Sequence, residues 1–147
     1  MAIPDSILSK PDPMDAGEWD FMRRHTVIGE RILAAAPSMK GVASIVRATH
    51  ERCDGGGYPD RLSGEAIPRA ARIIAVCDAY DAMVAARPYR PAISHGQALA
   101  ELRHCAGPQF DARVVDAFVA EFADRGPDGD PPALRVPEDS PLSAATA

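Results

Sequence analysis

Apolar residues recur at helical spacing in five stretches of the chain, and segments rich in proline and glycine separate these stretches. In the first stretch, Asp15 and Glu18 have the spacing of a capping box, which predicts a helix that begins after Asp15 and ends before Pro37. Ser38 is a candidate cap for a second helix, which we expect to run to about Glu51. No stretch alternates apolar and polar residues with the period of two that is typical of a strand.

Three further helices are predicted after a glycine-rich segment. Residues 52–67 contain four glycines, three of them consecutive, so a loop is expected there. Pro68 suits the first position of a third helix, which we expect over residues 69–86. Ser94 and Gln97 form a second capping-box pair at the start of a fourth helix, and Asp111 is the candidate cap of a fifth. The expected buried face of the third helix consists of Ile73, Ile74, Cys77, Tyr80, Met83 and Val84.

These elements predict an all-α bundle of about five helices. A chain of 147 residues suits one domain, which we place over residues 1–124. The segment from residue 125 to residue 147 contains five prolines and few large apolar residues, so it is expected to be a disordered, proline-rich tail.

Composition and charge exclude several classes of protein. The net charge of −5 disfavours general binding to a nucleic acid polymer or to an anionic membrane surface. No apolar run is long enough for a transmembrane helix, and the first residues do not have the pattern of a secretory signal. The three cysteines, Cys53, Cys77 and Cys105, form no CxxC motif and indicate free thiols in a reducing environment. We therefore expect a cytoplasmic protein.

Three polar residues, His25, His50 and Asp78, lie within otherwise apolar helix faces, and Asp81 shares the face of Asp78. Side chains of these types that project from different helices into one interior form the metal sites of helical bundles. Two imidazoles and one carboxylate suit iron, manganese or zinc. Gly29, one turn after His25, would leave room beside this ligand for a metal, water or substrate. The alternative is that each residue is an ordinary surface or core residue, and the spacing alone does not decide between the two.

The glycine-rich loop and two pairs of arginines leave similar alternatives open. The loop either cradles a phosphate through its backbone amides or only connects two helices, and it lacks the Lys-Ser/Thr of a P-loop. Arg87 and Arg90 either contact phosphate oxygens or are solvated surface charges. Arg23 and Arg24 are expected to face solvent.

Several motifs of the chain resemble the HD-GYP subgroup of the HD phosphohydrolases. The similarity extends in chain order from residue 2 to about residue 122. The matching stretches are Ile3–Leu8 (IPDSIL), His25–Gly29 (HTVIG), His50–Arg52 (HER), Asp54–Pro59 (DGGGYP), Leu62–Glu65 (LSGE), Ile67–Pro68, Ala71–Ile74 (ARII), Asp78–Ala82 (DAYDA), Arg87–Arg90 (RPYR), and Gly107 with Phe110–Asp111. The glycine loop with its flanking residues is the most specific of these.

The resemblance implies a metal-dependent phosphodiesterase that hydrolyses cyclic di-GMP to a linear dinucleotide or to GMP. It implies two or three divalent ions, often iron or manganese. It also implies cyclic di-GMP or a related nucleotide as ligand, and a diguanylate cyclase or an upstream receiver or sensor domain as partner. By position in the motifs, the metal ligands would be His25, His50 and Asp78, the substrate-binding residues Tyr58, Asp81, Arg87 and Arg90, and the loop motif Asp54, Gly55, Gly57, Tyr58 and Pro59.

The chain departs from the family pattern at its beginning. The His-Asp pair of the family, the lysine that follows this pair and an earlier helix with another histidine would all lie upstream of Met1. We therefore expect an N-terminally truncated domain with unassigned catalytic residues. Thr49 stands where many members have a second adjacent histidine, which favours two ions in a complete domain. The alternative is a catalytically inactive module for cyclic-dinucleotide signalling or protein interaction. His95 and His104 match no ligand position and are expected at the surface.

Overall fold

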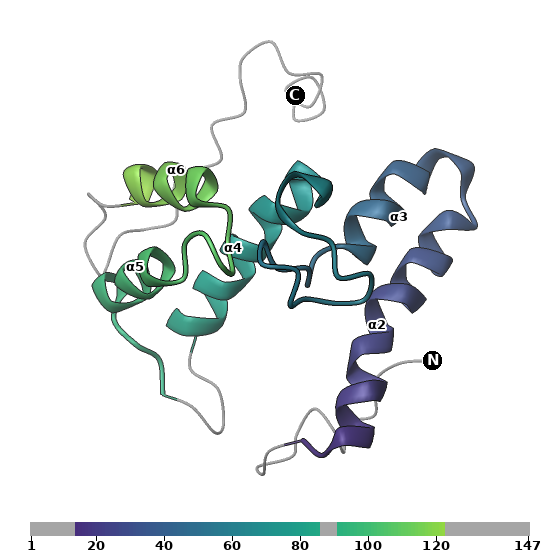
Figure 1. The fold of residues 1–147 in the computed structure, drawn as a ribbon, viewed down its shortest axis with the longest axis horizontal. Coiled ribbons are helices and arrows are strands. Elements are labelled where there is room, and N and C mark those ends of the chain that lie inside the picture. The colour runs from purple at the N-terminus through teal and green to yellow at the C-terminus, as the bar shows by residue number, and fades with distance from the viewer. Residues whose placement is uncertain (1–13, 86–90, 123–147) are drawn as a thin grey trace, which may run out of the picture.

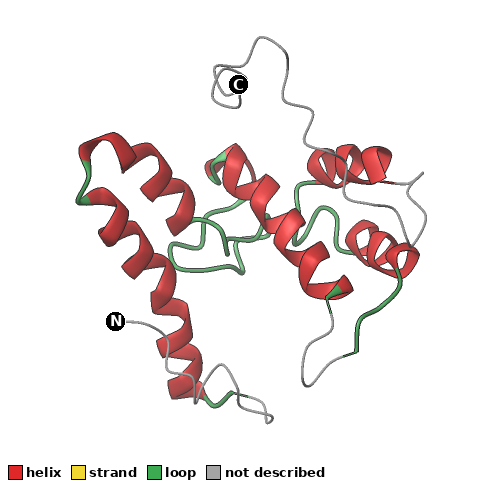
Figure 2. Cartoon of the chain, turned by 180° about the vertical axis from the view of Figure 1, so that it is seen from behind, coloured by secondary structure: helices red, strands yellow, loops and turns green. Residues whose placement is uncertain are grey.

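The computed structural model describes residues 14–85 and 91–122. Within these ranges it contains five α-helices, two short 3-10 helices and no strand, which confirms the predicted all-α fold (Figures 1 and 2). The elements are α2 (Ala16–Ala34), η1 (Pro37–Met39), α3 (Lys40–Arg47), η2 (Gly64–Ala66), α4 (Arg69–Val84), α5 (His95–His104) and α6 (Ala112–Phe122). Arg87, Arg90 and the proline-rich tail predicted over residues 125–147 lie outside the described residues.

Local capping signals explain where two of the helices begin. Asp15 accepts a hydrogen bond from the Glu18 amide, and the Glu18 carboxylate accepts one from the Asp15 amide, which completes the predicted capping box of α2. Ser94 and Gln97 form the same reciprocal arrangement at the start of α5. Asp111 precedes α6 as predicted, and its Oδ1 accepts the amide of Arg113.

The second predicted helix is wrong at both ends. Ser38 lies inside the 3-10 helix η1, and α3 begins after Met39 with no side-chain cap. The helix ends at Arg47 and not at Glu51. Tight turns follow α3 in place of another helical turn. The hydroxyl and the amide of Thr49 both donate to the carbonyl of Val46. This early end brings the residues after Arg47 out of the helix, and His50 is among them.

The helices form two packed groups that meet at the long helix α4. Helices α2 and α3 lie side by side as a hairpin, and α4 lies between this hairpin and the pair of α5 and α6 (Figure 1). The larger buried cluster joins α4, α5 and α6 and consists of Val76, Met83, Ala98, Leu99, Leu102, Phe110, Val115 and Val119. A smaller cluster of Ala48, Ile67 and Ala71 fixes the loop between α3 and α4 against α4.

The predicted buried face of α4 is partly wrong. Met83 is buried, but Ile73 and Ile74 are 43% and 42% exposed, and Cys77 is also exposed. The helix is apolar over most of its circumference, so its sequence pattern does not select one face. Its contacts with α5 and α6 bury Val76 instead.

The described helices include none that is both long enough and apolar enough to cross a membrane. Cys53, Cys77 and Cys105 are free thiols, as predicted. Burial raises the pKa of each of these thiols, which keeps them protonated at neutral pH.

Candidate metal and nucleotide site

Two of the predicted ligands meet between the α2–α3 hairpin and the glycine-rich loop. His25 lies in the middle of α2, and His50 follows the end of α3. Their ring centroids are 4.9 Å apart, and the rings meet edge to face at 73°. Because α2 and α3 pack side by side, His25 of α2 and His50, which follows α3, lie together as one imidazole pair.

The loop places Tyr58 against this pair. The amide of Tyr58 donates to the carbonyl of His50 at 3.1 Å, so the loop turns back over the residue from which it starts. The Tyr58 ring stacks on His50 with the centroids 5.2 Å apart and the planes at 15°, and it lies 6.4 Å from the His25 ring. Three rings thus form one partly buried group, which we call the aromatic triad: His25, His50 and Tyr58.

The hydrogen bond of His25 and the burial of His50 suit ligands of a metal. His25 Nδ1 lies 2.6 Å from the carbonyl oxygen of Met22, so Nδ1 is the donor, and Nε2 is the nitrogen that a neutral imidazole offers to a metal. A hydrogen bond of this kind orients most histidines that bind metals. Burial lowers the pKa of His50, with a further lowering by the charge of His25. His50 is therefore neutral at neutral pH, which is the form that binds a metal.

Asp78 lies near the triad but does not complete a compact donor set. It is exposed on α4, and its charge acts on the pKa of both His50 and Tyr58. Burial is the main cause that raises the pKa of Tyr58. The described residues nevertheless contain no three His, Cys, Asp or Glu side chains that are placed to hold one metal ion. The donor chemistry of the two imidazoles fits a divalent metal, and the structure brings together only this part of the predicted ligand set.

Asp81 is the remaining predicted substrate-binding residue in the described part of the chain. Asp81 is exposed on α4, close to the turn that carries Asp78. Arg87 and Arg90 lie outside the described residues.

Glycine is required at two positions of the loop. Gly55 has φ +78°, in the left-handed region that favours glycine. A Cβ atom on Gly57 would lie 2.4 Å from the amide nitrogen of Arg52 and 2.5 Å from Cα of Glu51. The loop therefore packs against its own beginning at backbone distance, and this contact sets the position of Tyr58, the next residue. The peptide bond between Tyr58 and Pro59 is cis.

The amides of the loop are used inside the loop. Gly55 donates to the carbonyl of Arg52, and Gly56 donates to the Asp54 carboxylate at 2.8 Å. Tyr58 donates to His50. These three amides are not free to bind a phosphate. For them the structure disfavours the alternative that the loop cradles a phosphate through its backbone amides.

Glu51 anchors the far side of the loop. Its side chain is among the few charged ones that are buried, with 5% of the residue exposed. The two carboxylate oxygens accept hydrogen bonds from the backbone amides of Asp60, at 2.7 Å, and Leu62, at 2.9 Å. A buried carboxylate needs such partners, and here the partners are the loop itself.

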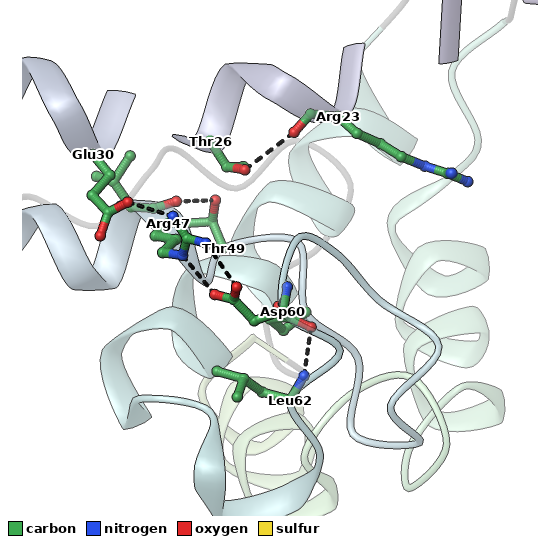
Figure 3. Close-up of polar contacts among 9 residues, drawn as sticks. Arg23, Thr26, Glu30, Arg47, Thr49, Asp60 and Leu62 are labelled. Atoms are coloured by element: carbon green, nitrogen blue, oxygen red, sulfur yellow. Dashed lines mark hydrogen bonds and ion pairs between the residues drawn. The ribbon is translucent and has the colours of Figure 1, made fainter. Parts of the chain in front are cut away.

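Ion pairs of Arg47 connect the loop to α2 and α3. Arg47 of α3 makes a bidentate contact with Asp60, at 2.6 and 2.7 Å, and a 2.5 Å contact with Glu30 of α2 (Figure 3). These partners hold the pKa of Arg47 above its usual range, and Arg47 in turn lowers the pKa of Asp60. The network therefore joins α2, α3 and the loop.

Asp54 plays a structural part in the loop motif. It forms a bidentate pair with Arg52, and these bonds together with the Gly56 amide lower the pKa of Asp54 to about 2. Arg52 also donates to Gln109, between α5 and α6, at 2.9 Å. The motif is thereby attached to the second group of helices.

Two expectations about single residues are corrected. Gly29 leaves no room for a ligand, because a Cβ there would lie 3.0 Å from Cγ1 of Val46, so its role is close packing of α2 on α3. His95 is not a free surface residue. It is partly buried and bridges the hydroxyl of Tyr80, at 2.7 Å, and the carbonyl of Phe122, at 2.9 Å. His104 is exposed, as expected.

The sequence reading missed the residues that build the loop, namely Arg47, Glu51, Arg52 and Asp60. Their partners are backbone amides or distant side chains, and no spacing rule connects them. The one available signal was that Glu51 is a charged residue directly next to a glycine-rich loop, where a carboxylate finds backbone donors.

Comparison with known proteins identifies the family. A family model described as "HD domain" matches residues 1–114. The chain belongs to the HD domain family. Its relatives carry the names of cyclic dinucleotide phosphodiesterases, which is the activity that the resemblance to the HD-GYP subgroup implies. A cyclic di-GMP phosphodiesterase of Vibrio cholerae is 42% identical over 127 residues, which cover 82% of this chain and 26% of that protein.

Two other relatives and one solved structure agree with this assignment. The cyclic di-GMP phosphodiesterase response regulator RpfG of Xanthomonas campestris is 46% identical over 121 residues, or 81% of this chain and 32% of that protein. A 3'3'-cGAMP-specific phosphodiesterase of Vibrio cholerae is 42% identical over 83% of this chain and 24% of its own length. A crystal structure of a cyclic GMP-AMP specific phosphodiesterase of V. cholerae superposes with TM-score 0.50 at 25% identity, over 58% of this chain and 19% of that one. The chain thus spans at most about a third of these relatives.

Proposed function

We propose that this chain is part of a metal-dependent phosphohydrolase that cleaves a phosphodiester bond of a cyclic dinucleotide. The observation that carries the proposal is the imidazole pair, His25 and His50, with Tyr58 stacked on it. Relatives with 42–46% identity to the chain are named as phosphodiesterases of cyclic di-GMP or cGAMP. We infer cyclic di-GMP or a closely related nucleotide as the substrate.

In this proposal His25 and His50 are metal ligands through neutral imidazole nitrogens, and Asp78 supplies a carboxylate from α4. Iron or manganese is the expected metal, with two ions in a complete domain. A bound ion of this kind activates water and stabilises charge on the phosphoryl oxygens. Tyr58 keeps His50 in orientation through their stacked rings and shields it from water.

The remaining predicted residues would act on the nucleotide. Arg87 and Arg90 would neutralise phosphate charge, and Asp81 would contact the bound dinucleotide beside Asp78. Asp54, Gly55, Gly57 and Pro59 would act indirectly, by fixing the loop that carries Tyr58. The partners proposed for the longer protein are a diguanylate cyclase or a receiver or sensor domain, and the name "response regulator" of one relative supports the latter. The site of action would be the cytoplasm.

The test is hydrolysis by the chain in the presence of manganese or ferrous iron. Cyclic di-GMP is incubated with the wild type, with His50→Gln and with His104→Gln, and the products are separated by chromatography. We expect the linear dinucleotide or GMP from the wild type and from His104→Gln, because His104 is an exposed histidine of α5. Loss of turnover in His50→Gln supports the proposal, and equal turnover in all three proteins contradicts it.

A second function is favoured by one observation. Because no three donors in the described part of the chain are placed to hold one ion, the chain also suits binding of a cyclic dinucleotide without hydrolysis. Calorimetry in a chelator separates the two. Binding of cyclic di-GMP without metal, together with no turnover after metal is added, favours the binding module.

A further inference from the structure

A cleft lies next to the aromatic triad, and neither histidine lines it. It has a volume of about 460 Å³. We call it the arginine cleft, and its lining consists of Arg23, Arg24, Val27, Gly55, Gly56, Gly57, Tyr58, Pro59 and Arg61. One wall is therefore α2, the other is the glycine loop, and no carboxylate lines it.

Two of the three arginines of this cleft have no ion-pair partner among the described residues. Among the described residues, Arg24 and Arg61 form no ion pair, and the carboxylate nearest to Arg23 is Asp20, at 3.9 Å with both side chains exposed. By contrast, Arg47, Arg52, Arg72 and Arg113 each contact a carboxylate at 3.2 Å or less. In a chain of net charge −5, three arginines around one cleft without a lining acid make a local positive field.

The nearest loop carboxylate does not cancel this field. Both oxygens of Asp54 are bound by Arg52, and one of them also accepts the Gly56 amide. Arg23 extends away from the network of Arg47 (Figure 3), and its guanidinium carbon lies 5.9 Å from the centre of the Tyr58 ring. The guanidinium groups of the cleft therefore remain available to a ligand.

The backbone of Arg61 is a separate indication. Arg61 has φ +56° and is the one residue other than glycine with positive φ in the described part of the chain. Glycine adopts this conformation without strain, whereas arginine does so at a cost. An arginine at such a position, on the edge of a cleft, is explained if its side chain has a task there.

We propose that the arginine cleft binds a phosphate group of the cyclic dinucleotide, beside the imidazole pair. Planar guanidinium groups match phosphate oxygens in charge and geometry. Tyr58 belongs both to this cleft and to the aromatic triad, so one nucleotide reaches both sites. The identity of the nucleotide rests on the proposed function, while the anion chemistry of the cleft rests on the three arginines.

The test is equilibrium binding of cyclic di-GMP to the full chain in a chelator, so that neither metal nor hydrolysis contributes. Arg61→Gly removes the guanidinium and relieves the backbone, and Arg24→Gln removes the charge from the α2 wall. Loss of one charge-assisted contact should raise the Kd at least about tenfold in each variant. The matched control is Arg31→Gln, which removes an exposed arginine of the same helix that does not line the cleft, and its Kd should stay within about twofold of the wild type.

Three outcomes would overturn the proposal. The first is unchanged binding in Arg61→Gly and Arg24→Gln with a native circular dichroism spectrum. The second is an equal loss in Arg31→Gln, which would show a general charge effect. The third appears when inorganic pyrophosphate replaces the nucleotide: if Arg61→Gly weakens only pyrophosphate binding, the cleft is a site for free phosphates.

Binding that depends on Arg61 without any turnover after metal is added would refute the hydrolase and leave this proposal intact. Turnover with an unchanged KM in Arg61→Gly would support the hydrolase and refute the proposed role of the arginine cleft.

Discussion

Removal of the Glu51 carboxylate should release the loop that carries Tyr58. In the structure this side chain, 5% exposed, accepts the amides of Asp60 and Leu62 at 2.7 and 2.9 Å. Glu51→Ala leaves both donors without their acceptor in a part-buried site. Each unsatisfied amide costs roughly 1–3 kcal/mol, so the free energy of unfolding should fall by about 3–5 kcal/mol. Glu51→Gln keeps one carbonyl acceptor and should lose about half as much.

The assay is urea denaturation followed by circular dichroism. The matched control is Glu65→Gln, because Glu65 forms only an exposed pair with Arg113 at 3.1 Å and its loss should change stability by less than about 1 kcal/mol. A second readout is the pKa of His50 by NMR, which burial lowers from 6.5 in the wild type. If Tyr58 leaves with the loop, this pKa should rise toward 6.5 in Glu51→Ala. A variant that unfolds like the wild type and keeps the lowered pKa would refute the anchoring role.

Three further predictions concern glycine, a buried ion pair and protonation. Gly57→Ala should destabilise the chain by about 3 kcal/mol in the same assay, since its Cβ would meet backbone atoms at 2.4 and 2.5 Å. Gly41→Ala, whose Cβ meets nothing within 4 Å, should stabilise the chain by about 0.5–1 kcal/mol. Equal effects of the two substitutions would contradict the reasoning. Asp111→Asn should cost about 3–5 kcal/mol at neutral pH, because Arg72, 11% exposed, would lose its 2.5 Å partner. Hydrogen bonds from Arg113 and Arg72 lower the pKa of Asp111 below 3.8. The contribution of Asp111 to the free energy of unfolding is therefore complete above pH 3.8 and is lost as the pH falls through the lowered pKa. A stability difference between wild type and Asp111→Asn that grows in acid would contradict this sign. The lowered pKa of His50 means that burial of its neutral ring favours folding above pH 6.5 and opposes it as the pH falls below 6.5, so His50→Gln should flatten that part of the stability profile.

Local signals in the sequence predicted where α2 and α5 begin. Capping boxes involve residues three apart, so Asp15 with Glu18 and Ser94 with Gln97 are readable from the chain alone. The buried face of α4 was not readable in the same way. That helix is apolar nearly all round, and packing against α5 and α6 decides that Val76 is buried while Ile73 stays exposed.

The imidazole pair could be predicted because the motifs around His25 and His50 resemble a family, whereas their spacing alone left the question open. The supporting residues could not be predicted. Glu51 binds backbone amides of residues nine and eleven positions further on, and only the folded loop brings them together. The arginine cleft likewise lies between α2 and the loop, and neither Arg24 nor Arg61 belongs to a motif that predicts such a cleft.

The central claim is that His25 and His50 bind one divalent metal, and a titration with Mn²⁺ followed by NMR of the imidazole groups tests it most directly. The chain has four histidines, so His95 and His104 serve as controls within the same sample. The paramagnetic ion should broaden the signals of His25 and His50 together, at low metal concentration, and leave those of His95 and His104 sharp. Equal broadening of all four histidines, or none at either member of the pair, would contradict the claim.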